Sequence, residues 1–125
     1  MIKTMTSNSE QYLEEIYKRQ AEICSALSNP IRLRILDILS FKDEKTNSEM
    51  LEILKIPKSN LTQHLGILIK AGIIETRKEG LYHYTKLAFP QIKDACQMIR
   101  RILLEQIQQS EDNNKKIKSV LKKKT

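Results

Sequence analysis

Residues 58–70 bring together polar side chains whose chemistry suits contact with a nucleic acid. Hydroxyl and amide groups can bond to base edges and phosphate oxygens, and lysines neutralise phosphate charge. The composition of this stretch therefore favours a role in nucleic-acid recognition. The candidate side chains are Lys58, Ser59, Asn60, Thr62, Gln63, His64 and Lys70.

A helix over Ser59–Lys70 would separate these groups from an apolar side. At 100° per residue, Leu61, Leu65 and Leu68 fall on one face and should be buried. Ser59, Gln63, Gly66 and Lys70 fall opposite, with Asn60, Thr62 and Ile67 beside them. His64 projects next to the leucines, so two roles stay open for it: fixing the helix by a hydrogen bond, or touching phosphate.

The segment that follows has the composition of a β-hairpin. Residues 73–77 and 81–85 are rich in β-branched and aromatic side chains, as strands prefer. Lys78-Glu79-Gly80 would join them as a turn. His83 lies between two tyrosines and is expected to be an exposed strand residue rather than a ligand.

Charge is concentrated on this region and on the C-terminus. The chain of 125 residues carries a formal charge of +7, which favours an anionic partner. Residues 55–86 have a net charge of +4, and so do residues 111–125, which hold six lysines. We find no apolar run that could span a membrane and no secretory signal, and two cysteines do not make a disulfide framework, so a cytoplasmic protein is expected.

The preceding elements are expected to be helical. Apolar residues at 3–4 spacing predict a helix over residues 9–27, and Ser28-Asn29-Pro30 would end it and start a core helix over residues 31–39. Thr46 and Glu49 fit a capping box for a helix that ends near Leu54. A short turn at residues 55–57 then precedes the polar helix, which gives a helix-turn-helix arrangement.

The last helix is expected to run from residue 90 to about residue 109. The first and last helices both carry more apolar surface than a small core needs, so we expect them to form a homodimer interface. We predict three segments: a flexible N-terminus at 1–8, a DNA-binding and dimerisation domain at 9–110, and a disordered Lys-rich tail at 111–125.

Three motifs together resemble the ArsR/SmtB-type bacterial repressors. Residues 26–36, which read ALSNPIRLRIL, resemble the entry to their core helix. Residues 59–74 resemble their recognition helix and its exit, and residues 81–84 resemble the returning strand of their wing. The resemblance covers about residues 12–108.

This resemblance implies a mainly α, winged helix-turn-helix fold with a small antiparallel hairpin. It implies a homodimeric repressor that binds double-stranded DNA at an inverted repeat and leaves it when an inducer binds. By position, Ser59, Asn60, Thr62, Gln63 and His64 would face DNA from the recognition helix. Arg77, Lys78 and Tyr82 would contact it from the wing.

The usual metal sites of the family do not fit this sequence. The helix before the recognition helix, Asn47–Leu54, has no cysteine, and no histidine follows His83. Two interpretations stay open for Cys24 and Cys96: small buried interface residues, or thiols that sense an oxidant, a soft metal or arsenite. The second would make a thiol-bound inducer the ligand, and no other cofactor is expected.

Other functions have less support in the sequence. The alternative to a DNA-binding regulator is a winged helix that binds another protein and does not read DNA. Lys58, Lys70, Arg77 and Lys78 argue against it, since such a module has no need for this basic surface. We do not expect an enzyme, because we find no catalytic carboxylate pair, phosphate loop or nucleophile arrangement.

Overall fold

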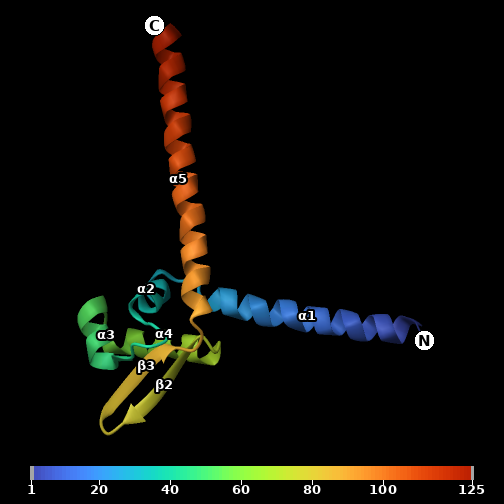
Figure 1. Ribbon diagram of the computed structural model, residues 1–125, viewed down its shortest axis with the longest axis vertical. Helices are drawn as coiled ribbons and strands as arrows, with labels where there is room; N and C mark the ends of the chain where they lie inside the picture. Colours follow the sequence, from blue (N-terminus) through green and yellow to red (C-terminus); the bar gives the residue numbers. More distant parts are fainter. Residues whose placement is uncertain (1, 125) are drawn as a thin grey trace. The chain divides into compact units, whose positions relative to one another are not determined.

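The computed structural model describes residues 2–124, and the side chains of residues 8–123 (Figure 1). The chain divides into two units, residues 1–90 and residues 91–125. The fold is mainly α with a small antiparallel sheet, which confirms the predicted class. The elements are α1 Ile2–Ala26, α2 Pro30–Ile38, β1 Lys45–Thr46, α3 Asn47–Leu54, α4 Lys58–Lys70, β2 Ile74–Glu79, β3 Tyr82–Leu87 and α5 Gln91–Lys124.

Apolar residues from α2, α3, α4 and the sheet form the core of the first unit. Asn29 caps α2 by accepting hydrogen bonds from the backbone N–H groups of Ile31 and Arg32, and Pro30 occupies the first turn. A fully buried aliphatic side chain contributes about 1.5–3 kcal/mol, so this core fixes how α4 lies. The largest buried side chains are Ile35, Leu36, Leu39, Met50, Leu61, Leu68 and Leu87.

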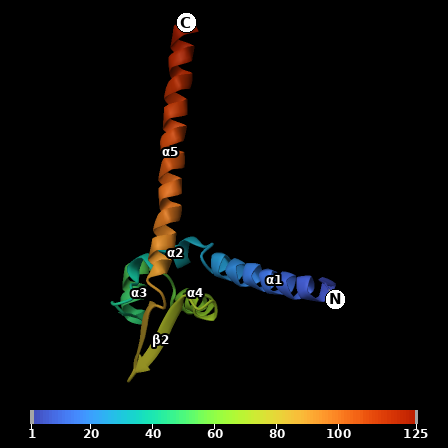
Figure 2. The same ribbon diagram turned by 45° about the vertical axis from the view of Figure 1, so that its right-hand side comes forward.

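The sheet has three antiparallel strands in the order β1-β3-β2. β2 and β3 pair from Ile74↔Leu87 to Glu79↔Tyr82, so a two-residue loop joins them. Gly80 in that loop has a φ of +62°, which glycine adopts without a steric penalty. The short strand β1 pairs with β3 through Lys45↔Thr85 and Thr46↔Tyr84, directly before α3 begins. Figure 2 shows the end of the hairpin projecting past α3 and α4.

The first and last helices are longer than the sequence predicts. α1 begins at Ile2 rather than near Ser9, and α5 extends over 34 residues instead of ending near residue 109. Residues 111–124 are therefore helical where a disordered tail is expected. They hold Ile117, Val120 and Leu121 at 3–4 spacing and no Gly or Pro, which favours continuation of the helix. Met1 and Thr125 lie outside the described residues, and the division at residues 8 and 110 stays a prediction.

Candidate nucleic-acid interface

Helices α3 and α4 form the predicted helix-turn-helix. Thr46 and Glu49 make the expected capping box, since the Thr46 hydroxyl accepts from the Glu49 backbone N–H at 3.1 Å and Glu49 accepts from the Thr46 N–H at 3.0 Å. These bonds lower the pKa of Glu49, chiefly through the Thr46 backbone. Lys55 ends α3 in a left-handed conformation with a φ of 53°. The turn therefore uses a lysine where helix-turn-helix units often place glycine.

Helix α4 has one buried side and one exposed side. Leu61, Leu65 and Leu68 are 1%, 6% and 0% exposed, as predicted. Across the helix, the predicted contact residues Lys58, Ser59, Asn60, Thr62, Gln63 and Lys70 are all exposed. The Thr62 hydroxyl donates to the Lys58 carbonyl at 3.0 Å, so its oxygen remains able to accept a further hydrogen bond.

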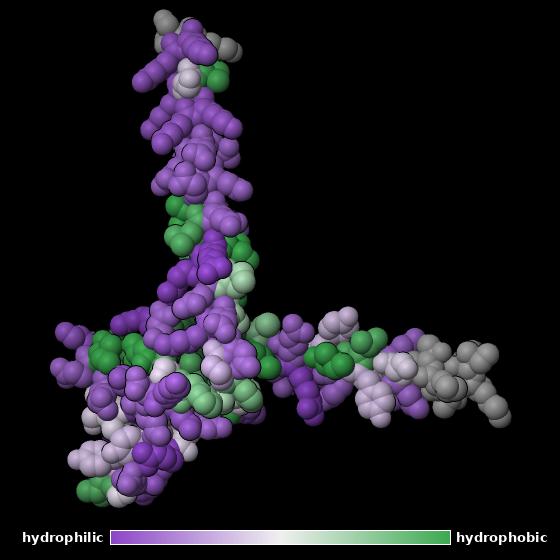
Figure 3. Space-filling model, viewed as in Figure 1, coloured by the Kyte–Doolittle hydropathy of each residue, from purple (hydrophilic) through white to green (hydrophobic). Residues whose placement is uncertain are grey.

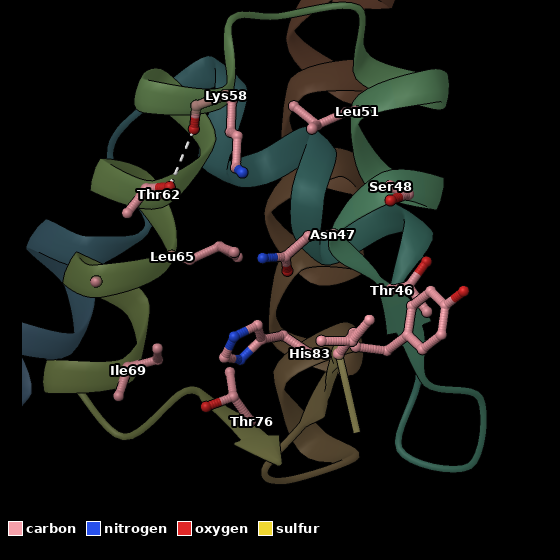
Figure 4. A pocket seen from close by; sticks show the side chains of 13 residues that line it. Thr46, Asn47, Ser48, Leu51, Lys58, Thr62, Leu65, Ile69, Thr76 and His83 are labelled. Carbon is pink, nitrogen blue, oxygen red and sulfur yellow. Dashed lines mark hydrogen bonds between the residues drawn. The ribbon is translucent and has the colours of Figure 1, made fainter. Parts of the chain in front are cut away.

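A groove of about 590 Å³ lies between one flank of α4, the start of α3 and the hairpin (Figure 4). Lys58, Thr62, Leu65, Gly66 and Ile69 form the α4 wall. The opposite wall and floor come from Thr46, Asn47, Ser48, Leu51, Thr76, Leu81, Tyr82 and His83. Figure 4 shows the side chains of Asn47 and His83 extending into the space between α3 and α4.

The described residues that line the groove bring positive charge and hydroxyl groups but no negative charge. None of the described residues that line it carries a carboxylate, while Lys58 and several hydroxyl groups do line it. Gly66 contributes no side chain, and a Cβ built there would meet no atom within 4 Å. A polymer with a phosphate backbone could therefore approach the α4 backbone closely at this point.

The two faces of the hairpin differ in charge. Strand alternation places Thr76, Lys78 and His83 on the face that borders the groove, since Thr76 and His83 line it and Lys78 pairs in register with His83. Arg77 lies on the other face. There its guanidinium pairs with Glu79 and with Glu44, at 2.9 Å for the latter, and stacks 4.4 Å from the centre of the Tyr84 ring.

Arg77 is thus held by anionic groups. The hydrogen bond to Glu79, and after it the one to Glu44, raises the pKa of Arg77 above its ordinary value. Tyr82 is exposed near the loop and lies close to Tyr84, with ring centroids 6.4 Å apart. The predicted DNA contacts therefore fall into two sets, Lys78 toward the groove and Arg77 away from it.

His64 is held by another helix. Its Nδ1 atom lies 3.3 Å from Nη1 of Arg32, and the ring is half-buried. The same Arg32 side chain donates to the carbonyl of Ala26 at 2.6 Å and to that of Ser25 at 3.3 Å. Arg32 thereby joins the end of α1 to α4, and His64 has the partner that a positioning role requires.

The two cysteines lie on helices of different units. Cys24 is exposed on α1, and Cys96 is half-buried on α5. No group of three or more potential metal ligands occurs among the described residues. Within residues 2–124, no helix has the length and apolar character needed to cross a membrane.

Several residues that line the groove are not among the contacts predicted from the sequence, and Asn47, Thr76 and His83 are three of them. Asn47 begins α3, and its Oδ1 atom is buried with no hydrogen-bond partner in the described part of the chain. Thr76 and His83 could have been found from the hairpin register, because a two-residue loop pairs Thr76 with Thr85 and Lys78 with His83. The predicted three-residue turn at residues 78–80 implies a different register, so these pairs did not follow from it.

A helix-turn-helix whose second helix is exposed beside a β-hairpin defines a winged-helix DNA-binding protein. Comparison with known proteins supports the assignment to this class. A family profile described as a helix-turn-helix domain matches residues 27–77. The HTH-type transcriptional regulator Rv0081 of Mycobacterium tuberculosis is 32% identical over 90 residues, which are 72% of this chain and 79% of that protein. Its crystal structure superposes with a TM-score of 0.67 at 30% identity, over 75% of this chain and 94% of that one.

One further relative specifies the family, and a further solved structure shares the fold. The arsenical resistance operon repressor of Staphylococcus aureus is 31% identical over 86 residues, covering 69% of this chain and 82% of the repressor. The fold also matches Mb0332 of Mycobacterium bovis, described as a homodimeric winged helix-turn-helix domain, with a TM-score of 0.66 at 23% identity over 74% and 84% of the two chains. This chain belongs to the ArsR-type family of winged helix-turn-helix transcriptional regulators.

Proposed function

We propose that this regulator is a homodimeric repressor that binds an inverted-repeat operator in the cytoplasm and leaves it when an inducer binds. The observation that carries the proposal is the exposed polar side of α4, which adjoins a groove that has no carboxylate among its described lining residues. Buried leucines fix the opposite side of the same helix, so the polar side chains are held in position for a rigid partner.

The proposed contacts divide into base readout and phosphate binding. Ser59, Asn60, Thr62 and Gln63 would face base edges from α4 in the major groove. Lys58 would bind phosphate from within the groove, where His83 and Asn47 also line it, and Lys70 and Lys78 would bind phosphates outside that lining. Arg77 would contribute less than the sequence suggests, because two carboxylates already neutralise it, whereas Tyr82 lines the groove and would contact DNA from there. His64 would act mainly by holding α4 against Arg32.

The dimer would form through α1 and α5. Both helices expose apolar side chains in a single stripe, including Leu13, Ile16 and Ile23 on α1 and Ile99 and Leu103 on α5. Such stripes on a small domain are typical of an interface between copies. Two α4 helices could then enter successive major grooves about 34 Å apart.

A binding experiment tests this proposal directly. The protein would be titrated with a duplex from its own promoter region that contains an inverted repeat, and with a scrambled duplex of equal length, over a salt series. We expect tighter binding to the first duplex and a steep loss of affinity with salt. Equal affinity for both duplexes would contradict specific readout and favour the protein-interaction alternative.

The proposed inducer is a thiol-reactive species that acts on Cys24 and Cys96. Thiolates bind soft metals and arsenite and react with oxidants, and Cys24 is exposed. We expect Cys24→Ser or Cys96→Ser to retain DNA binding while losing release by arsenite or by an oxidant. Release of a Cys24→Ser/Cys96→Ser double variant at the wild-type arsenite concentration would exclude this inducer chemistry.

A further inference from the structure

Arg32 of α2 uses all three nitrogens of its guanidinium group to connect two other helices. Nε donates to the carbonyl of Ala26 at 2.6 Å and Nη2 to that of Ser25 at 3.3 Å, both in the last turn of α1. Nη1 lies 3.3 Å from Nδ1 of His64 on α4, where it can donate to the tautomer that leaves Nδ1 unprotonated. A planar group with fixed donor directions therefore spans the junction between α1 and α4.

Little else in the described part of the chain fixes α1 against its own unit. Among the described side chains of this helix, residues 8–26, Ala26 alone is buried, and Leu13 and Ile16 are more than half exposed. Figure 3 shows hydrophobic side chains on the exposed surface of α1. The connection to α2 consists of residues 27–29. The angle between α1 and α4 therefore depends on this short connection and on the guanidinium group.

We propose that Arg32 is a positioning residue that holds α1 and α4 at a fixed angle and thereby sets the spacing of the two half-sites that a dimer can read. The inference rests on the dimer of the proposed function, in which α1 forms part of the interface and α4 enters the major groove. A rigid link between these helices fixes the separation of the two α4 helices. One inserted base pair moves a half-site by about 3.4 Å and rotates it by about 35°, so a rigid dimer should reject it.

Two simpler roles for Arg32 would leave half-site spacing unaffected. Arginine commonly caps the carbonyl groups at the end of a helix, and Arg32 could do no more than that for α1. It could also serve only the stability of the fold. The contact with His64 favours the larger role, since it carries the guanidinium group beyond α1 to a half-buried ring on the helix proposed to read DNA.

The test measures how strongly the full-length protein rejects a changed spacing. Its probes are the inverted-repeat duplex from the promoter region, the same duplex with one central base pair inserted, and a duplex with a single half-site. The spacing penalty is the dissociation constant for the inserted duplex divided by that for the native duplex. Wild type should show a penalty of at least about tenfold, which corresponds to about 1.4 kcal/mol.

Substitutions of Arg32 remove the link at its centre. Arg32→Gln should reduce the penalty to less than about threefold, with half-site affinity within about twofold of wild type, because the buried leucines still hold α4. Arg32→Lys should behave in the same way, since one ammonium group cannot span all three acceptors. Arg34→Gln is the matched control on the same helix. Arg34 donates to the Leu54 carbonyl of α3 at 3.4 Å, so this variant should keep the full penalty.

Substitutions of His64 test the α4 end of the link alone. His64→Ala leaves Arg32 bonded to the α1 carbonyls and should lower the penalty at least about threefold, mainly through tighter binding of the inserted duplex. His64→Asn carries its amide oxygen at the same number of bonds from the backbone as Nδ1, so it can accept the same hydrogen bond and should restore the wild-type penalty. A cap for α1 alone would leave both variants with the full penalty and overturn the inference.

The outcomes also separate the inference from the proposed function. If wild type binds the native and inserted duplexes equally, or is monomeric in sedimentation equilibrium, the proposed dimeric reading of an inverted repeat fails and the inference fails with it. If wild type shows the penalty and both Arg32→Gln and His64→Ala retain it, the inference fails alone. If thermal unfolding shows that Arg32→Gln does not fold, the two His64 variants decide, and a full penalty in His64→Ala overturns the inference.

Discussion

The two faces of the wing carry neighbouring cations with different surroundings. Arg77 and Lys78 are adjacent in the sequence, yet strand alternation sends their side chains to opposite faces. Arg77 meets Glu44, Glu79 and the Tyr84 ring, whereas Lys78 shares its face with Thr76 and His83 beside the groove. The number of basic residues in a segment therefore does not indicate how much positive charge it can offer to DNA.

The largest loss of DNA binding is expected when a side chain is added at Gly66, on the α4 wall of the groove. Gly66→Glu should weaken operator binding at least about 100-fold, because a carboxylate would project toward the phosphates, where one misplaced charge costs several kcal/mol. The fold should persist, since a Cβ at this position meets no atom within 4 Å. Fluorescence anisotropy with operator duplex, with thermal unfolding in parallel, measures both properties.

Gly66→Ala is the matched control for that change. Its small side chain carries no charge, and alanine in a helix interior is about 1 kcal/mol more favourable than glycine. The variant should therefore melt at a higher temperature and bind the operator within roughly tenfold of wild type. Equal binding by Gly66→Glu and wild type would show that DNA does not approach this side of α4.

The comparison of the two faces predicts unequal effects of two alanine variants. Lys78→Ala should weaken DNA binding about fivefold to tenfold and reduce the salt slope by about one, as expected for the loss of one phosphate contact. Arg77→Ala should change affinity less than about threefold, because Glu44 and Glu79 already compensate its charge. The reverse order of these effects would mean that the outer face of the wing contacts the DNA.

The two histidines provide a smaller contrast. His83→Ala should weaken DNA binding about threefold and leave stability nearly unchanged, since the side chain is an exposed wall of the groove. His64→Ala should lower the free energy of unfolding by about 1 kcal/mol, the typical value of one hydrogen bond, with affinity within about twofold of wild type. Urea denaturation and anisotropy separate the two outcomes.

The smallest expected effect is on the pH dependence of stability. It involves Glu49 at the start of α3, a segment that forms part of the groove. The pKa of Glu49 is lower in the folded chain, first because of the Thr46 backbone N–H and then because of the Thr46 side chain. A lowered folded-state pKa stabilises the protein at neutral pH, and this contribution is lost as the pH falls through that pKa. The melting temperatures of wild type and Glu49→Gln should therefore converge on acidification; a constant difference would contradict this role.

Much of the architecture follows from local sequence signals. The capping box at Thr46, the Asn29-Pro30 boundary and the leucine spacing of α4 are each set within a few residues of the chain, and the structure has all three. The short strand β1 and the groove depend on contacts between segments about 40 residues apart, such as Lys45↔Thr85. No single-segment pattern contains that information.

Such local patterns could predict only part of the candidate DNA-binding surface. The helical projection correctly exposes Ser59, Gln63 and Gly66 and buries the leucines. It could not reveal that Arg77 pairs with Glu44, because these residues meet only when the loop before β1 lies beside the hairpin. Likewise, the lysine content of residues 111–124 suggested disorder, while their apolar spacing favoured the helix that the structure has.

The strand β1 has a mechanical consequence. Its two residues bond to β3 and are followed at once by the first residue of α3, so the backbone couples the wing to the helix-turn-helix without an intervening linker. The width of the groove is then set by main-chain pairing that depends little on side-chain identity. Related regulators could therefore exchange the outward-facing residues of α4, and so change the DNA sequence they select, while the frame that presents those residues keeps its dimensions.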